Sequence, residues 1–380
     1  MSVSIKLSEI DTPSLLIDKV KLFDNIDACQ RKAYELGVNW RPHVKTHKCA
    51  PIAVMQTRGM FGGITVSTVK EAEYMFEEEG IADIIYAVGI APNKLPRIAL
   101  LNKRGADVKV ILDNAASAMI VSEFCRKQGI KLGVLLEIDC DGHRSGLKPT
   151  DPELVTVAKA LTDGATFKGV LTHAGDSYLA VGHEAQLACA ENEVRQINAA
   201  AETLKAAGFV SEIVSVGSTP TFMAAQSAPG VTEYRSGVGV FYDLFMAGIG
   251  VCEVSQIALS VLVTVIGHQP QKGWILTDGG WMAMSRDRGT ANQAVDWGYG
   301  LVCDEKGKPI EGLWMKSANQ EHGIICRRDG APINPEDYPV GTRLRILPNH
   351  ACPTAAAFDK YFVVGENNNV QTIWSRINNW

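Results

Sequence analysis

The chain has 380 residues, a formal net charge of -5 at pH 7 and 46% hydrophobic residues. This length accommodates two domains, or one large barrel with an appended domain, and either arrangement can bury a substantial core. The acidic balance argues against a general nucleic-acid binder, although it is compatible with a local basic site.

Nine cysteines are scattered along the chain without zinc-finger spacing. An odd, unpatterned set of this kind is typical of a reduced protein, so we expect cytoplasmic localisation. The opening residues, MSVSIK, contain no apolar core of signal-peptide length, and no segment approaches the length of a membrane span. We therefore expect a soluble protein with neither a membrane nor a nucleic acid as partner.

Strand-like and helix-like patterns alternate through the first two thirds of the chain. Eight short apolar runs predict strands at 38–44, 63–66, 83–88, 107–112, 132–138, 167–173, 212–216 and 232–236. Helical patterns cover 19–36, 68–79, 93–104, 115–128, 151–161 and 184–207. Eight such units with short connections predict a closed, parallel (β/α)8 barrel over residues 18–250, with a doubly wound open sheet as the alternative.

The pattern changes after about residue 250. Apolar runs at 254–266, 274–276, 312–315, 323–326, 342–347 and 361–364 are separated by Gly, Asn and Pro turns. Few helix-length patterns occur between them, which predicts a β-rich second domain over 251–380. We expect residues 1–17 to join this domain or to pack beside it.

A basic run, WRPHVKTHK at 40–48, places Lys45 at the end of the first predicted strand. Neighbouring positive charge and partial desolvation both favour a neutral amine, which is the form that attacks an aldehyde such as that of pyridoxal phosphate. Taken alone, such a cluster is more often a solvated surface or a phosphate contact. Active sites of (β/α)8 barrels form at the C-terminal ends of the strands, where Lys45 is predicted to lie.

Small and polar residues also follow the later strands. The fifth predicted strand runs into DCDGHRSG at 139–146, the sixth into HAGDSY at 173–178, the seventh into GSTP at 217–220 and the eighth into RSGVG at 235–239. Small residues and hydroxyls there bring backbone N–H groups close to an anion, and Pro220 suits the first turn of an anion-binding helix. Together with Lys45, these turns indicate a phosphate-bearing ligand.

The β-rich part contains LPNHACP at 347–353, in which His350 and Cys352 are two residues apart. In extended backbone such residues project to the same side, so both side chains could bind one metal ion. A thiolate and an imidazole together suit zinc best among the divalent ions. An ordinary buried cysteine beside a loop histidine is an equally weighted interpretation of these residues.

Several motifs follow one another in the order seen in fold-type III pyridoxal-phosphate enzymes. They are DTP at 11–13, PHVKTH at 42–47, HAG at 173–175, GSTPT at 217–221, YRSG at 234–237, FYD at 241–243, DGG at 278–280, SRDRG at 285–289, EHG at 321–323 and PNHAC at 348–352. The chain resembles the D-serine dehydratase and D-threonine aldolase family over nearly its whole length. This resemblance implies an alanine racemase-like barrel, bound pyridoxal 5'-phosphate, a divalent metal and a homodimer.

The resemblance also implies roles for individual residues of the barrel. Lys45 would carry the cofactor as a Schiff base, Arg144 would approach its phenolic oxygen, and Tyr178 would approach its pyridine nitrogen. His173 would stack on the cofactor ring or support the end of the sheet. The residues implied to hold the phosphate are Gly217, Ser218, Thr219, Gly237 and Val238.

His350 and Cys352 would bind the metal, with zinc expected first and magnesium or manganese as alternatives. The family pairs histidine with cysteine in its zinc dehydratases and tends to use aspartate in its aldolases, so Cys352 favours dehydration. The implied substrate is a D-3-hydroxy amino acid, with conversion of D-threo-3-hydroxyaspartate to oxaloacetate and ammonia preferred. Alternatives are D-serine dehydration to pyruvate, D-threonine aldol cleavage, racemisation, and a carrier of the cofactor that is not an enzyme.

The surroundings of the substrate side chain are less regular. Hydroxyaspartate carries a second carboxylate, for which Arg41, Arg286 and Arg288 are candidate partners, although each is by default a structural or solvent-exposed arginine. Two positions depart from the family pattern. Trp281–Met282 stands where a basic residue is expected, and Asn319–Gln320 stands where an acidic one is expected.

Overall fold

A computed structural model describes residues 5–380, which form two compact units. The barrel unit comprises Ala28–Gly237 with the last two residues of the chain, and the β unit comprises the chain up to Asp27 with Val238–Asn378. The sequence pattern predicts domain boundaries after residues 17 and 250, whereas the chain divides after Asp27 and Gly237. Residues 1–4 of its predicted N-terminal segment lie outside the described residues.

The barrel unit contains eight parallel strands in the order β3-β10-β9-β8-β7-β6-β5-β4. They are β3 Asn39–Trp40, β4 Ile64–Val66, β5 Asp83–Gly89, β6 Asp107–Leu112, β7 Leu132–Ile138, β8 Ala165–Thr172, β9 Ile213–Val216 and β10 Glu233–Tyr234. A parallel bridge between His43 and Thr65 joins the two outermost strands. There Thr65 N–H donates to Pro42 O at 2.9 Å and Val44 N–H donates to Thr65 O at 3.0 Å. The sheet therefore closes, as predicted, and is not a doubly wound open sheet.

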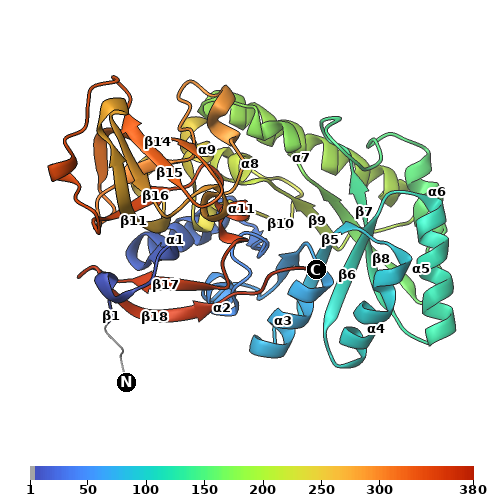
Figure 1. Ribbon diagram of the computed structural model, residues 1–380. Coiled ribbons are helices and arrows are strands. Elements are labelled where there is room, and N and C mark those ends of the chain that lie inside the picture. Colours follow the sequence, from blue (N-terminus) through green and yellow to red (C-terminus); the bar gives the residue numbers. More distant parts are fainter. Residues whose placement is uncertain (1–4) are drawn as a thin grey trace. The chain divides into compact units, whose positions relative to one another are not determined.

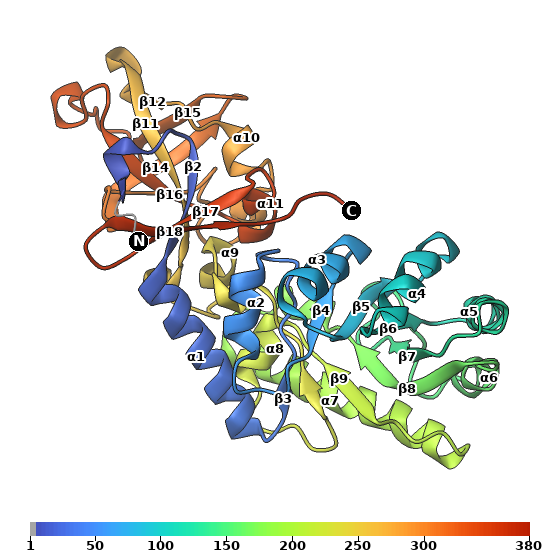
Figure 2. The same cartoon turned by 90° about the horizontal axis from the view of Figure 1, so that it is seen from below.

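Helices follow the strands in regular alternation. They are α2 Ala50–Thr57, α3 Val69–Glu79, α4 Leu95–Lys103, α5 Ala115–Gln128, α6 Glu153–Lys159, α7 His183–Ala206 and α8 Thr219–Ala224, and α1 Lys19–Leu36 precedes β3. Figures 1 and 2 show α3 to α7 on the outer side of the strands. Local signals explain their ends: the Thr68 side chain accepts the Glu71 N–H at 3.0 Å, and Gly80 ends α3 with φ of 67°.

The barrel interior is apolar in its middle and ionic at the N-terminal ends of the strands. Four successive strands contribute Ile85, Ile111, Leu135 and Leu171 to one buried cluster. Residues at alternate positions of a strand share a face, so the charged residues two or more positions earlier, such as Asp83 and Lys109, belong to the same interior.

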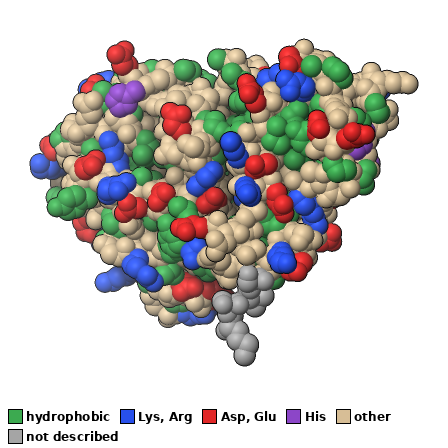
Figure 3. Space-filling view, turned by 90° about the vertical axis from the view of Figure 1, so that its left-hand side faces the viewer, with side chains coloured by type: hydrophobic (Ala, Val, Ile, Leu, Met, Phe, Trp, Pro, Cys, Tyr) green, Lys and Arg blue, Asp and Glu red, His purple; other side chains and the backbone are tan. Residues whose placement is uncertain are grey.

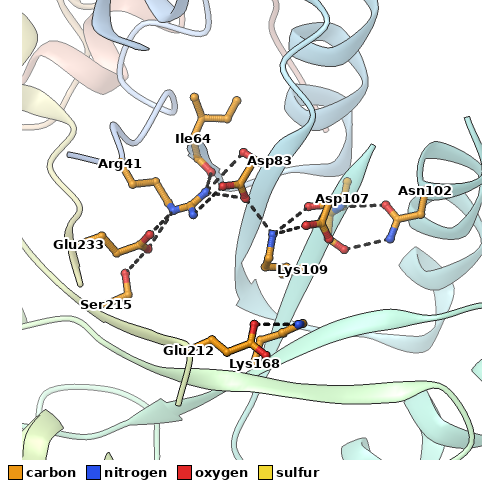
Figure 4. Close-up of polar contacts among 11 residues, drawn as sticks. Arg41, Ile64, Asp83, Asn102, Asp107, Lys109, Lys168, Glu212, Ser215 and Glu233 are labelled. Atoms are coloured by element: carbon orange, nitrogen blue, oxygen red, sulfur yellow. Dashed lines mark hydrogen bonds and ion pairs between the residues drawn. The ribbon is translucent and has the colours of Figure 1, made fainter. Parts of the chain in front are cut away.

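Arg41 is the centre of this ionic network and is 1% exposed. Its Nε donates to both carboxylate oxygens of Glu233 at 2.8 and 2.9 Å, and its Nη atoms donate to Asp83 at 3.0 Å. Lys109 Nζ in turn lies 2.8 Å from Asp83 and 2.7 Å from Asp107 (Figure 4). Because these contacts occupy its guanidinium, Arg41 is not available to a substrate carboxylate, which corrects one of the three candidates above.

The β unit is built on a ten-stranded sheet in the order β1-β18-β17-β2-β11-β12-β15-β14-β13-β16. Its strands are β1 Ile5–Lys6, β2 Ser14–Asp18, β11 Leu259–Gln269, β12 Trp274–Thr277, β13 Leu301–Cys303, β14 Pro309–Ala318, β15 Gly323–Arg327, β16 Arg343–Leu347, β17 Lys360–Val364 and β18 Asn369–Ser375. A further β11–β16 pairing closes six of these strands into a ring. Three short helices complete the unit: α9 Leu244–Gly248, α10 Trp281–Met284 and α11 Ala351–Ala355.

The described residues contain no helix with the length and apolar character needed to cross a membrane. Figure 3 shows Lys and Arg side chains interspersed with Asp and Glu side chains on the face drawn. That mixture accords with the net charge of -5 and offers no continuous basic surface on this face.

Replacing Arg41 by Met should destabilise the protein by about 3–5 kcal/mol, because the buried Glu233 carboxylate loses its paired cation. Denaturant unfolding measures this loss. Replacing Arg104, whose ion pair with Glu77 is half exposed, is the matched control and should cost less than about 1 kcal/mol. Equal losses in the two variants would contradict a special role for the buried network.

Candidate active site

Lys45 lies in a turn directly after the seam that closes the barrel, and its side chain is exposed. The partial desolvation expected for this residue is therefore not found. Its backbone N–H donates to His43 Nδ1 at 3.4 Å, and His43 Nε2 lies 3.4 Å from Ser67 Oγ. Burial, with the nearby positive charge of Lys45, lowers the pKa of His43 well below its usual value. A neutral imidazole is what this arrangement needs, since Nδ1 accepts a hydrogen bond.

His173, Tyr178 and Arg144 follow the neighbouring strands β8 and β7. His173 Nδ1 donates to Gly217 O at 2.8 Å, and burial lowers the pKa of His173 to about 3, so the ring is neutral. Tyr178 ends a 3-10 turn, Gly175–Tyr178, and its ring centroid lies 6.0 Å from that of His173. Arg144 is exposed, with Nη2 at 3.9 Å from a carboxylate oxygen of Glu137. All three side chains thus lie at the C-terminal end of the barrel.

The predicted phosphate-binding glycines allow close approaches between backbone segments. Gly217 has φ of +140°, and a Cβ there would lie 2.1 Å from the backbone oxygen of Arg235. A Cβ at Gly237 would lie 3.0 Å from Thr46 Oγ1. Gly217 therefore needs glycine for packing, whatever else it binds, and a side chain at Gly237 would crowd Thr46. Val238 follows Gly237 and is the first residue of the β unit on this side of the chain.

Ser218 and Thr219 begin helix α8 and differ in how their hydroxyls are used. Ser218 Oγ accepts the Thr221 N–H at 3.2 Å and lies 2.7 Å from Ser177 Oγ, so it serves as the helix cap. Thr219 Oγ1 is buried and has no hydrogen-bond partner among the described residues. A buried hydroxyl without a partner is costly, and an oxygen-rich ligand would satisfy it.

Glu193 is a functional candidate that the sequence analysis missed. It is 0% exposed on α7, and its Oε1 accepts the Gly217 N–H at 2.7 Å and the Ala174 N–H at 3.2 Å. His173 holds the carbonyl of Gly217, so the two side chains hold the N–H and the C=O of one residue. Its spacing from Ala190, Val194 and Ile197 places a charged residue on the buried face of the helix, which is the signal that could have identified it.

The metal candidates His350 and Cys352 lie at the start of α11 in the β unit. His350 is the N-cap and Cys352 is the second helical residue, so the expectation of an extended backbone is wrong here. The side chains nevertheless meet, because the helix begins between them. Asp287 Oδ2 accepts a hydrogen bond from His350 Nδ1 at 2.6 Å. Burial lowers the pKa of His350, but hydrogen bonds to Asp287 and Cys352 outweigh it and raise the pKa to about 11.

Asp243 fixes the position of this helix. It is buried, its Oδ1 accepts the Met246 N–H at 2.9 Å, and its Oδ2 accepts the Ala351 N–H at 2.9 Å. One carboxylate therefore caps both α9 and α11, and burial raises its pKa. Within residues 5–380, no group of three or more His, Cys, Asp or Glu side chains is arranged to hold a metal. A metal held by His350 and Cys352 would thus keep several positions open for water or substrate.

Replacing Glu193 by Gln should change how stability depends on pH. Burial raises the pKa of Glu193 to about 7, so the folded protein holds this proton more tightly than the unfolded chain, in which a glutamate titrates near about 4.3. Stability from Glu193 is therefore present at low pH and is lost as pH rises to about 7. The free energy of unfolding of Glu193→Gln, relative to the natural protein, should rise between pH 5 and 8.

The companion variant Glu193→Leu removes the acceptor of two buried N–H groups and should be less stable at every pH by roughly 2–5 kcal/mol. Chemical denaturation at several pH values measures both variants. A pH-independent difference for Glu193→Gln would show that the carboxyl does not titrate as described.

Residues 17–244 match the alanine racemase N-terminal domain family, and residues 258–364 match the family described as "Putative serine dehydratase domain". The D-threo-3-hydroxyaspartate dehydratase of Delftia sp. (strain HT23) is 50% identical over 378 residues, which cover 98% of this chain and 99% of that protein. The solved structure of the Delftia enzyme has a TM-score of 0.96 at 49% identity, covering 99% of this chain and 100% of that one.

Two more distant relatives have other activities. The D-serine dehydratase of Dictyostelium discoideum is 29% identical over 98% of both chains. The solved D-threonine aldolase from Filomicrobium marinum has a TM-score of 0.83 at 25% identity, covering 99% of this chain and 97% of that one. The racemase-type match spans more than half of the chain, and the Delftia relative aligns over 98% of it. The chain therefore belongs to the fold-type III pyridoxal-phosphate enzymes, in the family of the D-serine dehydratases and D-threonine aldolases.

Proposed function

We propose that this protein is a dehydratase that converts D-threo-3-hydroxyaspartate to oxaloacetate and ammonia, using pyridoxal 5'-phosphate and a divalent metal. The observation that carries the proposal is the His350–Cys352 pair, oriented by Asp287, in a chain 50% identical to an enzyme of that activity. A solved D-threo-3-hydroxyaspartate dehydratase with one cysteine replaced by alanine is described as metal-free, and another solved form has a histidine replaced two positions earlier. His350 and Cys352 have the same spacing.

The barrel unit has the features needed to hold the cofactor. Thr219 Oγ1 and Tyr234 OH are buried without hydrogen-bond partners among the described residues. The Gly217 N–H is already bound by Glu193, so the support for a phosphate here is the unpaired Thr219 hydroxyl beside two positions, Gly217 and Gly237, that carry no side chain. We assign the phosphate to Gly217, Ser218, Thr219, Gly237 and Val238; the N–H and the hydroxyl of Ser218 both take part in the cap of α8 with Thr221.

Lys45 is assigned the covalent and proton-transfer roles. Pyridoxal phosphate, when bound, draws electrons from the substrate's Cα and so makes the Cα proton acidic. The ε-amine of Lys45, when not bound to the cofactor, would accept that proton. We assign contacts on the cofactor to three further residues, Arg144, His173 and Tyr178. The neutral state of His173 suits stacking rather than proton donation, because its Nδ1–H already donates to Gly217.

His350 and Cys352 are assigned to the metal, and zinc suits an imidazole–thiolate pair best, with magnesium or manganese as alternatives. A divalent ion, when bound, acts as a Lewis acid that makes the β-hydroxyl a better leaving group. Asp287 accepts the His350 Nδ1–H, which fixes the ring orientation, and the second ring nitrogen, hydrogen-bonded to Cys352, would coordinate the metal after losing its proton. After loss of water, the enamine product hydrolyses to the 2-oxo acid and ammonia.

The alternatives make different use of these residues. D-Serine dehydration needs the same groups but no partner for a second carboxylate, and aldol cleavage needs a base for the β-hydroxyl proton. A racemase needs a second acid–base group, for which Tyr299 and Tyr361 are the candidates. Tyr361 is fully buried and Arg376 Nε donates to its OH at 3.1 Å, which disfavours that role. A cofactor carrier has no evident use for the oriented His350.

Purified protein should release oxaloacetate from D-threo-3-hydroxyaspartate faster than it releases pyruvate from D-serine, and prior chelation should abolish both reactions. Coupled assays of the 2-oxo acids measure this. Replacing Lys45 by Ala should abolish turnover even with metal present, and replacing Cys352 by Ala should mimic chelation. Dominant pyruvate would favour D-serine dehydratase. Glycine and an aldehyde as products, or oxo-acid release that survives chelation, would contradict the proposal.

We also propose that the protein is a cytoplasmic homodimer. All nine cysteines are free thiols in the described structure, as is typical of a reducing compartment. Fold-type III barrels commonly complete their sites with a partner's second domain. Sedimentation velocity should therefore give a species of twice the 41.1 kDa of one chain. A monomer at all micromolar concentrations would contradict the dimer.

A further inference from the structure

Arg286 of the β unit is exposed and has no anionic partner among the described residues. Arg286 directly precedes Asp287, whose carboxylate holds His350. The guanidinium carbon of Arg286 lies 5.2 Å from the centre of the Trp281 ring. Among residues 5–380, its guanidinium forms no ion pair or hydrogen bond. Its charge is therefore held in place by an aromatic face and remains available to an anion.

The adjacent Arg288 differs in this respect. Its Nη2 lies 2.5 Å from Asp296 Oδ2, so its charge already has a carboxylate partner. It also lies over the Tyr299 ring, at 5.6 Å from the ring centre. Arg286 and Arg288 thus flank Asp287 with the same side-chain type, but only Arg286 can bind an anion without breaking an existing ion pair.

Trp281 is one of the two positions that depart from the family pattern, and the structure connects it with the other. The Trp281 N–H donates to Asn319 O at 2.9 Å, and the Met282 N–H donates to Gln320 O at 3.1 Å. A Cβ at Gly280 would lie 2.3 Å from Asn319 O, so the backbones are in close contact. The two departures from the family pattern, at Trp281–Met282 and Asn319–Gln320, are therefore in direct contact through their backbones.

The turn after α10 brings Arg286 back over Trp281. Ser285 ends this helix with φ of 71°, and its Oγ accepts the Asp287 N–H at 3.1 Å. The same turn therefore places Arg286 over the indole ring and Asp287 against His350. The cation and the carboxylate that orients His350 therefore come from adjacent residues of one turn.

The second carboxylate of the proposed substrate calls for a cation near the metal residues. In 3-hydroxyaspartate the hydroxyl and the second carboxylate are attached to the same carbon atom. If a metal at His350 and Cys352 binds the hydroxyl, the second carboxylate, which is attached to the same carbon atom, must lie next to that metal. The geometry points to Arg286 as the residue that binds the second carboxylate and makes the enzyme prefer hydroxyaspartate to serine, an inference that rests on the proposed function.

Replacing Arg286 by Gln tests this assignment. It should lower kcat/KM for D-threo-3-hydroxyaspartate by roughly 10- to 150-fold, the range for hydrogen bonds between charged groups, because D-threo-3-hydroxyaspartate loses its partner. D-Serine has no second carboxylate, so its kcat/KM should change less than about threefold, within ordinary mutational variation. Arg286→Lys should restore part of the preference, since lysine keeps the charge but not the planar fork. Trp281→Leu should weaken the preference by releasing the guanidinium.

Arg288→Gln is the matched control and should leave the ratio of the two kcat/KM values unchanged. An equal loss for both substrates in Arg286→Gln would overturn the assignment, because it would indicate damage to the neighbouring metal residues. The assignment would also be overturned if Arg288→Gln changed the ratio of the two kcat/KM values and Arg286→Gln did not.

A binding measurement separates this inference from the proposed function. Succinate carries two carboxylates but has no amine or hydroxyl to react, and calorimetry should show that it binds the natural protein and Arg288→Gln more tightly than Arg286→Gln. If this holds while neither amino acid yields an oxo acid, the dehydratase proposal fails and the carboxylate site stands. Succinate affinity that does not depend on Arg286 would overturn the site itself.

Discussion

The barrel unit depends on the way in which residues 41–44 close its sheet. The N–H groups of Arg41 and His43 bond to the last strand, through Tyr234 O and Ser236 O, whereas Pro42 O and Val44 N–H bond to Thr65 on the other side. Proline loses nothing here because only its carbonyl is needed. The alternate residues Arg41 and His43 then face the interior, with His43 nearer to the C-terminal end of the barrel. Lys45 follows them in the turn. Closure of the sheet and placement of the lysine are therefore one structural event.

The β unit positions its chemistry by a different means, the start of a very short helix. A five-residue helix has little stability of its own, so its position comes from contacts to other elements. Asp243 supplies the main contact by capping α11 through Ala351, while Asp287 fixes the His350 ring. The two carboxylates come from segments about a hundred and about sixty residues earlier in the chain. An imidazole and a thiol are thus held by groups that need not touch a metal themselves.

Much of this architecture was predictable, and the exceptions have physical causes. Most of the barrel strands stand out because they are buried, apolar and bounded by turn residues, whereas β3 and β10 are only two residues long and each includes a polar residue. Helix α2 was missed because it is short and apolar on most sides, with Pro51 in its first turn, and so lacks periodicity. Strand β18 was missed because it is largely polar, pairing with β17 and the two-residue β1. Lys45 and His350 lie in local motifs; the helical spacing of Glu193 marks it as buried, but its partners Ala174 and Gly217 are 19 and 24 residues away, so its role is not visible locally.

The ionic network around Arg41 blocks one end of the barrel to small molecules. Guanidinium, carboxylate and ammonium groups occupy the N-terminal ends of the strands, and an apolar layer with Ile85, Ile111 and Leu135 lies above them. A small molecule could cross this end only by separating buried ion pairs. The barrel interior is therefore closed at the N-terminal ends of its strands. A ligand of Lys45, at the opposite ends of the strands, would therefore have to enter and leave on that side.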